Sequence, residues 1–233
     1  MKLQTLITDK FKSNEFSRNE LDLFTAKLIS NAQNNPNSVL PKAEESLLVT
    51  AHKNFKANKS TLITESGLNK GGTITREDAY DDALEFIRRK EGLIKDAFGK
   101  GSAEYINFYP QGLTEYNQAT VEGMKDLLAR FVTIGKKHVG ELGQPFVDQA
   151  IALQDAYTDA RDTQVDGQST NKSAQTQLRE SRKVLTMQLT RCLHLIAAYT
   201  IENQEAYNSY FDWDLLEVDN DNPTPNEPIE TKK

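Results

Sequence analysis

Three histidines and one cysteine are the side chains in this 233-residue chain best suited to metal binding or nucleophilic chemistry. Metal sites in helical bundles commonly use Glu-x-x-His pairs that point inward. No histidine here has a glutamate three residues before it, and His138 and Glu141 stand in the reverse order. Cys192 and His194 would point to different faces of a helix, because successive helical residues are rotated by about 100°. The sequence therefore predicts no metal site and no cofactor.

Catalytic machinery of other kinds is equally hard to assemble from these residues. A Ser or Cys nucleophile needs a base and a group that orients the base, and no nucleophile-elbow motif is present in the sequence. Cys192 falls on the apolar side of a helical pattern, where cysteine behaves as a small hydrophobe. The glycines of 67–72 lack the GxxxxGK[ST] pattern of a phosphate loop. The four aspartates between 212 and 221 lack the glycine and glutamate of an EF-hand. We therefore expect no catalytic residues and predict that the protein is not an enzyme.

The elements that would position any site are long amphipathic helices. Between Leu113 and Phe211, apolar residues recur every three or four positions, as on one face of a helix. A similar stripe precedes this stretch, from Tyr80 to Phe98. Helices are predicted over about 75–98, 113–140, 146–165 and 171–210. Four apolar stripes that must cover one another predict an all-α fold, an up-down four-helix bundle.

The end of the third predicted helix has two interpretations. The run Asp166-Gly167-Gln168-Ser169-Thr170 is typical of a turn. However, a seven-residue phase continues through positions 160, 164, 167, 171 and 174, which allows a single helix from about 145 to 210. Gln164, Gly167 and Asn171 would lie on the buried seam of that helix and would bury poorly. We favour the turn.

The first 70 residues predict a helical hairpin attached to the bundle. Ser17 followed by Glu20 forms a capping-box pattern at the start of a short helix, and a second helix is expected over about 41–65. Three glycines within residues 67–72 indicate a turn or hinge. The predicted division is therefore an appendage at 1–70, a bundle at 71–211 and an acidic, Pro-containing tail at 212–233, which we expect to be flexible.

Charge is concentrated at the C-terminus. Residues 202–231 contain nine acidic and no basic side chains, although the whole chain carries a net charge of only −6. The bundle itself is therefore close to neutral, and nucleic-acid binding is not expected. No apolar run reaches the roughly 18 residues of a membrane span, and the N-terminus lacks the apolar core of a signal peptide. These features predict a cytoplasmic protein with no membrane span and no small-molecule substrate.

Two aromatic segments are the predicted attachment points for a protein partner or for self-association. Residues 105–112 either pack their aromatics over one end of the bundle or form an exposed recognition loop, since Tyr and Phe favour interfaces. Residues 211–216, which include the only tryptophan, provide apolar anchors for a tail that folds on a partner. The predicted partner-binding residues are Tyr105, Phe108, Tyr109, Phe211, Trp213, Leu215 and Leu216.

The resulting functional prediction is a non-enzymatic structural or interaction subunit of a larger assembly. One alternative is a toxin-like helical protein that forms oligomers and inserts in membranes, which long helices and the apolar run 193–201 would permit. The other is a bundle metalloenzyme, which would need inward carboxylates that the sequence does not indicate.

Overall fold

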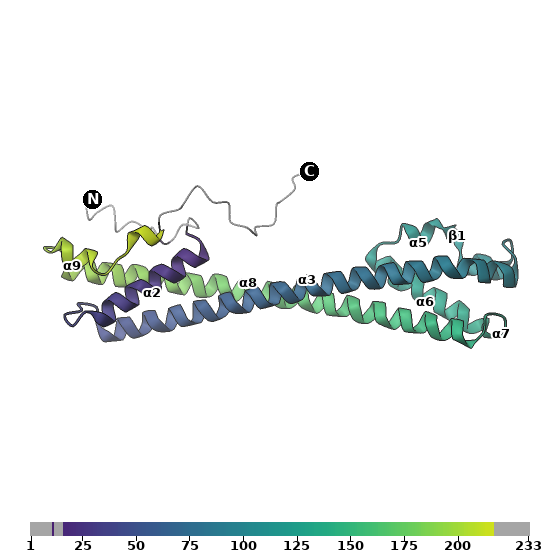
Figure 1. Cartoon of the computed structure of the whole chain (residues 1–233), viewed down its shortest axis with the longest axis horizontal. Helices are drawn as coiled ribbons and strands as arrows, with labels where there is room; N and C mark the ends of the chain where they lie inside the picture. Colours follow the sequence, from purple (N-terminus) through teal and green to yellow (C-terminus); the bar gives the residue numbers. More distant parts are fainter. Residues whose placement is uncertain (1–10, 12–15, 217–233) are drawn as a thin grey trace. The chain divides into compact units, whose positions relative to one another are not determined.

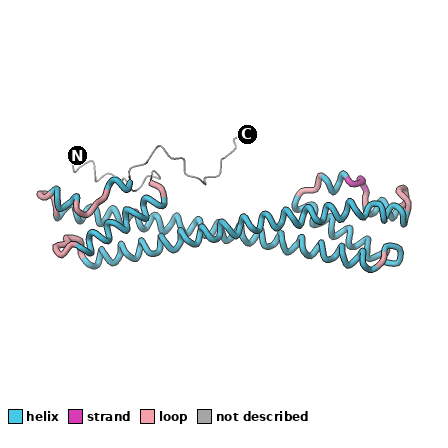
Figure 2. Tube along the Cα trace, viewed as in Figure 1, coloured by secondary structure: helices cyan, strands magenta, loops and turns pink. Residues whose placement is uncertain are grey.

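A computed structural model describes residues 11 and 16–216, and nearly all of them are helical (Figures 1 and 2). The predicted all-α class is confirmed; among the described residues one short strand, β1 (Pro110–Leu113), interrupts the helices. The chain divides into two compact units. Unit 1 combines residues up to Leu62 with those from Ala174 onward, and unit 2 comprises Ile63–Ser173. Two long helices, α3 (Lys42–Phe98) and α8 (Gln144–Tyr199), contribute to both units.

Unit 1 packs helix α2 (Arg18–Asn34) against the first part of α3 and the last part of α8. The predicted capping box is present: Ser17 Oγ accepts a hydrogen bond from the backbone N–H of Glu20, and the Glu20 carboxylate accepts one from the N–H of Ser17. Each bond satisfies a backbone donor that the first turn of a helix leaves unpaired. The short elements α9 (Gln204–Asn208) and η2 (Trp213–Leu216) complete the unit.

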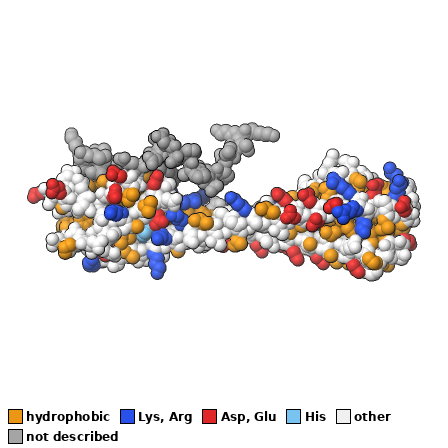
Figure 3. Space-filling model, viewed as in Figure 1, with side chains coloured by type: hydrophobic (Ala, Val, Ile, Leu, Met, Phe, Trp, Pro, Cys, Tyr) orange, Lys and Arg blue, Asp and Glu red, His pale blue; other side chains and the backbone are white. Residues whose placement is uncertain are grey.

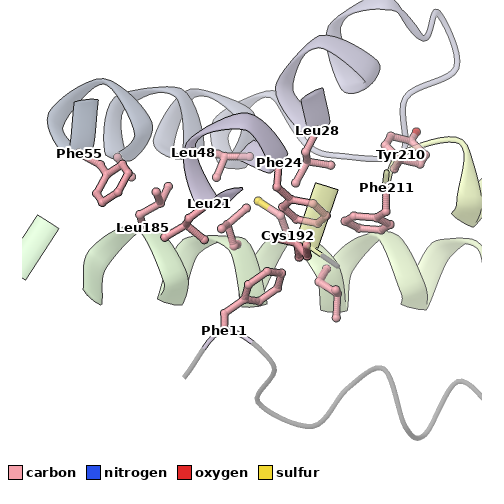
Figure 4. Close-up of a cluster of buried hydrophobic side chains, with 14 of the residues drawn as sticks. Phe11, Leu21, Phe24, Leu28, Leu48, Phe55, Leu185, Cys192, Tyr210 and Phe211 are labelled. Atoms are coloured by element: carbon pink, nitrogen blue, oxygen red, sulfur yellow. The ribbon is translucent and has the colours of Figure 1, made fainter. Parts of the chain in front are cut away.

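The core of unit 1 is formed by one buried apolar face from each of the three helices (Figure 4). Phe24 of α2 is at its centre, with its ring 5.6 Å from that of Phe11 and 6.2 Å from that of Phe211. The larger buried side chains around it are Leu21, Leu28, Leu48, Phe55, Leu185, Leu189, Cys192 and Ile196. These residues follow helical spacing on each element, so the stripes predicted from the sequence do form the core.

Unit 2 packs helix α6 (Val121–Lys137) against the remaining parts of α3 and α8. Thr120 caps α6 by accepting a hydrogen bond from the N–H of Gly123. Short elements connect it to the long helices: α4 (Ala103–Phe108), β1, α5 (Thr114–Asn117) and α7 (Val139–Leu142). The helix predicted over 113–140 is therefore divided into α5, α6 and α7.

Two predicted turns are wrong. Helix α3 passes through residues 67–72 without interruption, and α8 passes through 166–170. A single long helix, and not the turn, is thus the correct interpretation of residues 145–210, except that the helix ends at Tyr199. The four separate bundle helices expected from the sequence are replaced by two long helices with a third helix, α2 or α6, in each unit.

The reason for this continuity lies where α3 and α8 approach closely within unit 2. A Cβ atom on Gly72 would lie 3.4 Å from the Cα of Gln164, and one on Gly167 would lie 3.4 Å from the Cα of Asn69. One turn away, Ser66 Oγ donates a hydrogen bond of 3.1 Å to Asn171 Oδ1. The three residues expected to bury poorly therefore face small or polar residues of α3: Gln164 faces Gly72, Gly167 faces Asn69 and Asn171 faces Ser66.

Replacing Gly67 and Gly71 with alanine tests this continuity. Both glycines are helical and a Cβ at either position meets nothing within 4 Å, so alanine should add helix propensity at no steric cost. We expect each change to raise the free energy of unfolding by about 0.5–1 kcal/mol, measured by urea denaturation and circular dichroism. Gly143→Ala is the control and should destabilise, because Gly143 has a φ of 82°. Destabilisation by Gly67→Ala or Gly71→Ala would indicate the turn instead.

Candidate functional site

The predicted aromatic recognition segment is part of the core of unit 2. Tyr105, Phe108 and Tyr109 have 5%, 0% and 2% of their surface exposed. The Phe131 ring of α6 lies 5.1 Å from that of Phe108 and 6.1 Å from that of Tyr109. Of the two interpretations of residues 105–112, the structure shows the packing of aromatics in the bundle, and these three side chains offer almost no surface to a partner in this conformation.

The tyrosine hydroxyls in this region satisfy internal partners. Tyr109 donates to the backbone oxygen of Ile87 at 2.9 Å and Tyr105 donates to Glu91 at 2.7 Å. Burial, together with the nearby Glu91 carboxylate, raises the pKa of Tyr105 to about 12. Burial also raises the pKa of Tyr109. Neither hydroxyl therefore ionises near neutral pH, so these groups hold α4 against α3 rather than provide an acid or a base.

An ion pair that the sequence did not suggest fixes α5 on α6. Arg130 donates two hydrogen bonds to the Glu115 carboxylate, at 2.8 and 2.7 Å, and a third to the Tyr116 hydroxyl at 3.2 Å. The hydrogen bonds from Arg130 lower the pKa of Glu115. The Tyr116 hydroxyl in turn donates to the backbone oxygen of Phe108 at 2.6 Å. These bonds tie α4 and α5 to α6, and within this group Arg130 Nε is the one buried polar atom without a hydrogen-bond partner.

The second predicted segment, 211–216, folds back on unit 1. Phe211 and Leu216 are 6% exposed each, and Trp213 and Leu215 are partly buried against the same core. The Trp213 ring lies 5.4 Å from that of Phe24 in α2. These apolar residues are therefore occupied within the chain, and the predicted helix to residue 210 is replaced by α9 and η2. The acidic tail from residue 217 onward lies outside the described residues.

The reactive groups considered in the sequence do not form a site among the described residues. Cys192 is fully buried, and burial raises the pKa of its thiol to about 12. His138 Nδ1 lies 3.9 Å from Glu141 Oε2, and His52 Nε2 lies 2.7 Å from Asp22 Oδ1. In residues 11 and 16–216, no group of three or more His, Cys, Asp or Glu side chains is placed to hold a metal ion.

A surface groove lies between α3 and α8 in unit 1. We call it the unit 1 groove. One of its residues, Glu180, is charged, and the others are small, amide-bearing or apolar. It is lined by Ala51, Asn54, Ala57, Asn58, Gln177, Glu180, Ser181 and Val184, and Asn58 Nδ2 donates to the backbone oxygen of Gln177 at 3.3 Å.

Helix α2 does not line this groove, because it contacts a different face of α3. His52 and Lys59 of α3 both bind Asp22 of α2, with Lys59 Nζ 2.9 Å from Asp22 Oδ2. The residues that line the groove occupy the other side of the α3 helix, as its 3.6-residue period requires. The unit 1 groove is therefore a face of the α3–α8 pair that the third helix leaves uncovered.

Three exposed apolar side chains lie along this face. Val184 lines the groove, and helical spacing places Leu47 one turn from Ala51 and Met187 one turn from Val184. Leu47 is 51% exposed, Val184 is 48% exposed and Met187 is 66% exposed. Scattered apolar residues are common on protein surfaces, so it is their grouping along one groove that distinguishes these three. The sequence contained a signal for them, since Val184 and Met187 lie outside the stripe of Leu185 and Leu189 that forms the core.

The groove between the same two helices in unit 2 has the opposite character. Its lining includes the charged residues Asp82, Glu85, Arg89 and Lys90. Arg89 pairs with Glu85, and Lys90 lies 5.3 Å above the Phe86 ring, so that charged side chains cover what is apolar there. Acidic and basic side chains are also intermixed on the face of the molecule in Figure 3. The low charge of the unit 1 groove is therefore not a general property of the α3–α8 pair.

Comparisons with protein-family models, with curated proteins and with solved structures find no match to this chain. Among the described residues, no helix combines the length and the apolar character that crossing a membrane requires.

Replacing Tyr109 with alanine tests whether the aromatic segment is core. A buried aromatic truncated to alanine leaves a cavity, and we expect a loss of about 3–5 kcal/mol in the free energy of unfolding. Ile106→Ala is the matched control, because Ile106 is 49% exposed and should change stability by less than about 1 kcal/mol. Equal effects of the two substitutions in urea denaturation would contradict the burial of Tyr109.

Replacing Phe24 with alanine tests the packing of residues 211–216. Trp213 is the only tryptophan in the chain, so emission excited selectively from tryptophan reports on this segment alone. Removal of the Phe24 ring should expose the indole and shift its emission to longer wavelength. The neighbouring substitution Leu23→Ala, at a side chain that is 58% exposed, should leave the emission unchanged. An emission spectrum that is insensitive to Phe24→Ala would show that Trp213 does not pack on α2.

Proposed function

We propose that the protein is a non-enzymatic interaction subunit of a protein assembly and that it binds its partner through the unit 1 groove. The observation that carries this proposal is the unit 1 groove itself, which has little charge and has exposed apolar side chains along it. The groove between the same two helices in unit 2 is lined by four charged residues. A face of this kind suits the apolar side of another helix, because two adjacent helices form a channel into which a third can pack.

The chemistry of the groove supports moderate, specific binding. Leu47, Val184 and Met187 are about half exposed, so burying the remaining surface of each would contribute roughly 1 kcal/mol. Asn54 and Gln177 add side-chain amides that can donate and accept hydrogen bonds across an interface. Amides give orientation to an apolar contact because an incorrectly placed partner leaves them unpaired.

The segments 105–112 and 211–216 would contribute to binding only after a change in structure. Release of Phe211, Trp213 and Leu216 from unit 1 would expose the Phe24 ring, and release of Tyr109 would open the core of unit 2. Each process costs free energy before any partner contact is made. The acidic tail within 212–233 remains a proposed second attachment point, and among the described residues the unit 1 groove needs no such rearrangement.

Site-specific photocrosslinking tests this function. A photoreactive amino acid at Met187, on the border of the groove, should give a defined crosslinked product with another protein chain in the cells that naturally produce this protein. The same amino acid at Arg89, which is in the charged groove of unit 2, is the control and should not give that product. Val184→Glu should suppress the product at Met187. The same product from both positions, or none from Met187, would contradict the proposed function.

A further inference from the structure

We propose that the occupant of the unit 1 groove is the same groove of a second copy of this chain, so that two α3–α8 pairs pack face to face. This inference rests on the proposed function and names its partner. In such a dimer, α2 would cover one side of the α3–α8 pair in unit 1, and the second copy would cover the other side.

The groove is complementary to itself in shape. Val184 protrudes from its lining, which also contains the small residues Ala51, Ala57 and Ser181, and the exposed Leu47 and Met187 lie one helical turn beyond Ala51 and Val184. Two copies of such a face can interdigitate, because large side chains of one helix pack into the spaces between small residues of another. An isologous contact of this kind is also the commonest form of protein self-association.

Beyond the lining of the groove, a charge pair on the same two helices suits the same symmetry. In one chain, Arg191 Nη2 lies 2.6 Å from Glu44 Oε1, and Gln188 Nε2 donates to Glu44 Oε2 at 2.9 Å. The Arg191 side chain is nevertheless 62% exposed. A two-fold axis parallel to the helices would place α3 of one copy against α8 of the other at the same level. Each Arg191 would then also approach Glu44 of the second copy, forming an alternating group of two acids and two bases.

The single charged residue in the lining is accommodated by the same symmetry. Asn58 bonds to the backbone of Gln177, which places this level of α3 beside the turn of α8 that contains Glu180. In the second copy, Asn54 and Asn58 would lie opposite Glu180, and their amide N–H groups can donate to its carboxylate. The charge would thus be hydrogen-bonded at the interface, as a desolvated carboxylate requires.

Partners with a strong charge fit this groove less well. An acidic segment, including the tail of the chain itself, would find no basic side chain in the lining, and a basic segment would find only Glu180. Electrostatic attraction of either sign is therefore weak, whereas a second copy supplies a neutral face with matched amides and apolar side chains.

The test is the mass of the full-length protein in solution, measured by light scattering over a dilution series. We expect twice the chain mass of 26.2 kDa. The double substitution Val184→Glu with Met187→Glu should raise the dimer dissociation constant by at least about tenfold, because it buries unpaired charge at the centre of the contact. Both side chains are about half exposed or more, so circular dichroism should show unchanged helicity.

Leu93→Glu is the matched control. Leu93 is 45% exposed, belongs to unit 2 and does not line the unit 1 groove, so this variant should remain a dimer. A monomeric wild-type protein would overturn the proposal, as would a dimer that persists in the double variant. A crosslink from Met187 to a different protein, together with a monomeric wild type, would reject the second copy as occupant while leaving the proposed function intact.

Discussion

The close antiparallel contact of α3 and α8 is the constraint on which the described structure depends. Gly72 and Gly167 allow the two backbones to approach, and Ser66 and Asn171 bond beside them. Isolated helices gain little from intrinsic propensity, so most helical stability comes from tertiary contacts. A glycine-containing segment that would otherwise favour a turn is therefore held in a helix by the helix opposite. Because both long helices continue through this contact, each can supply apolar residues to two separate cores.

The two cores are built in similar ways. In each unit a helix of 17 residues, α2 or α6, covers one side of the long pair and contributes phenylalanine to the centre of the cluster. Among the described residues, the three helices of each unit leave one side of the long pair uncovered, and the side chains on this side differ between the units. In unit 2 Lys90 and Arg89 cover it, whereas in unit 1 it carries Val184 and few charges. This contrast between two faces of the same helices supports the proposal that the unit 1 groove is a docking surface.

Much of the secondary structure could be predicted from the sequence, because helical periodicity and capping are local properties. The capping box at Ser17 and the apolar stripe through Leu185 and Cys192 are both found as expected. The continuity at 67–72 and 166–170 could not be predicted, because it depends on which residues lie across the helix pair. Burial of Tyr109 was also undecidable, since an aromatic segment has the same composition in a core and at an interface. The groove was missed because its exposed residues lie beside the dominant stripe.

The exposure of the groove residues distinguishes them from the residues that hold the fold together. Leu47, Val184 and Met187 are largely exposed, so they contribute little to the free energy that holds unit 1 together, whereas Phe24 and Phe55 are fully buried. Apolar side chains that do not stabilise their own fold carry a cost, because exposed apolar surface favours non-specific association. That cost is offset when a specific partner covers the surface. The proposed self-association would cover the exposed Val184 with small residues of a second copy and would leave Glu44 and Arg191 paired.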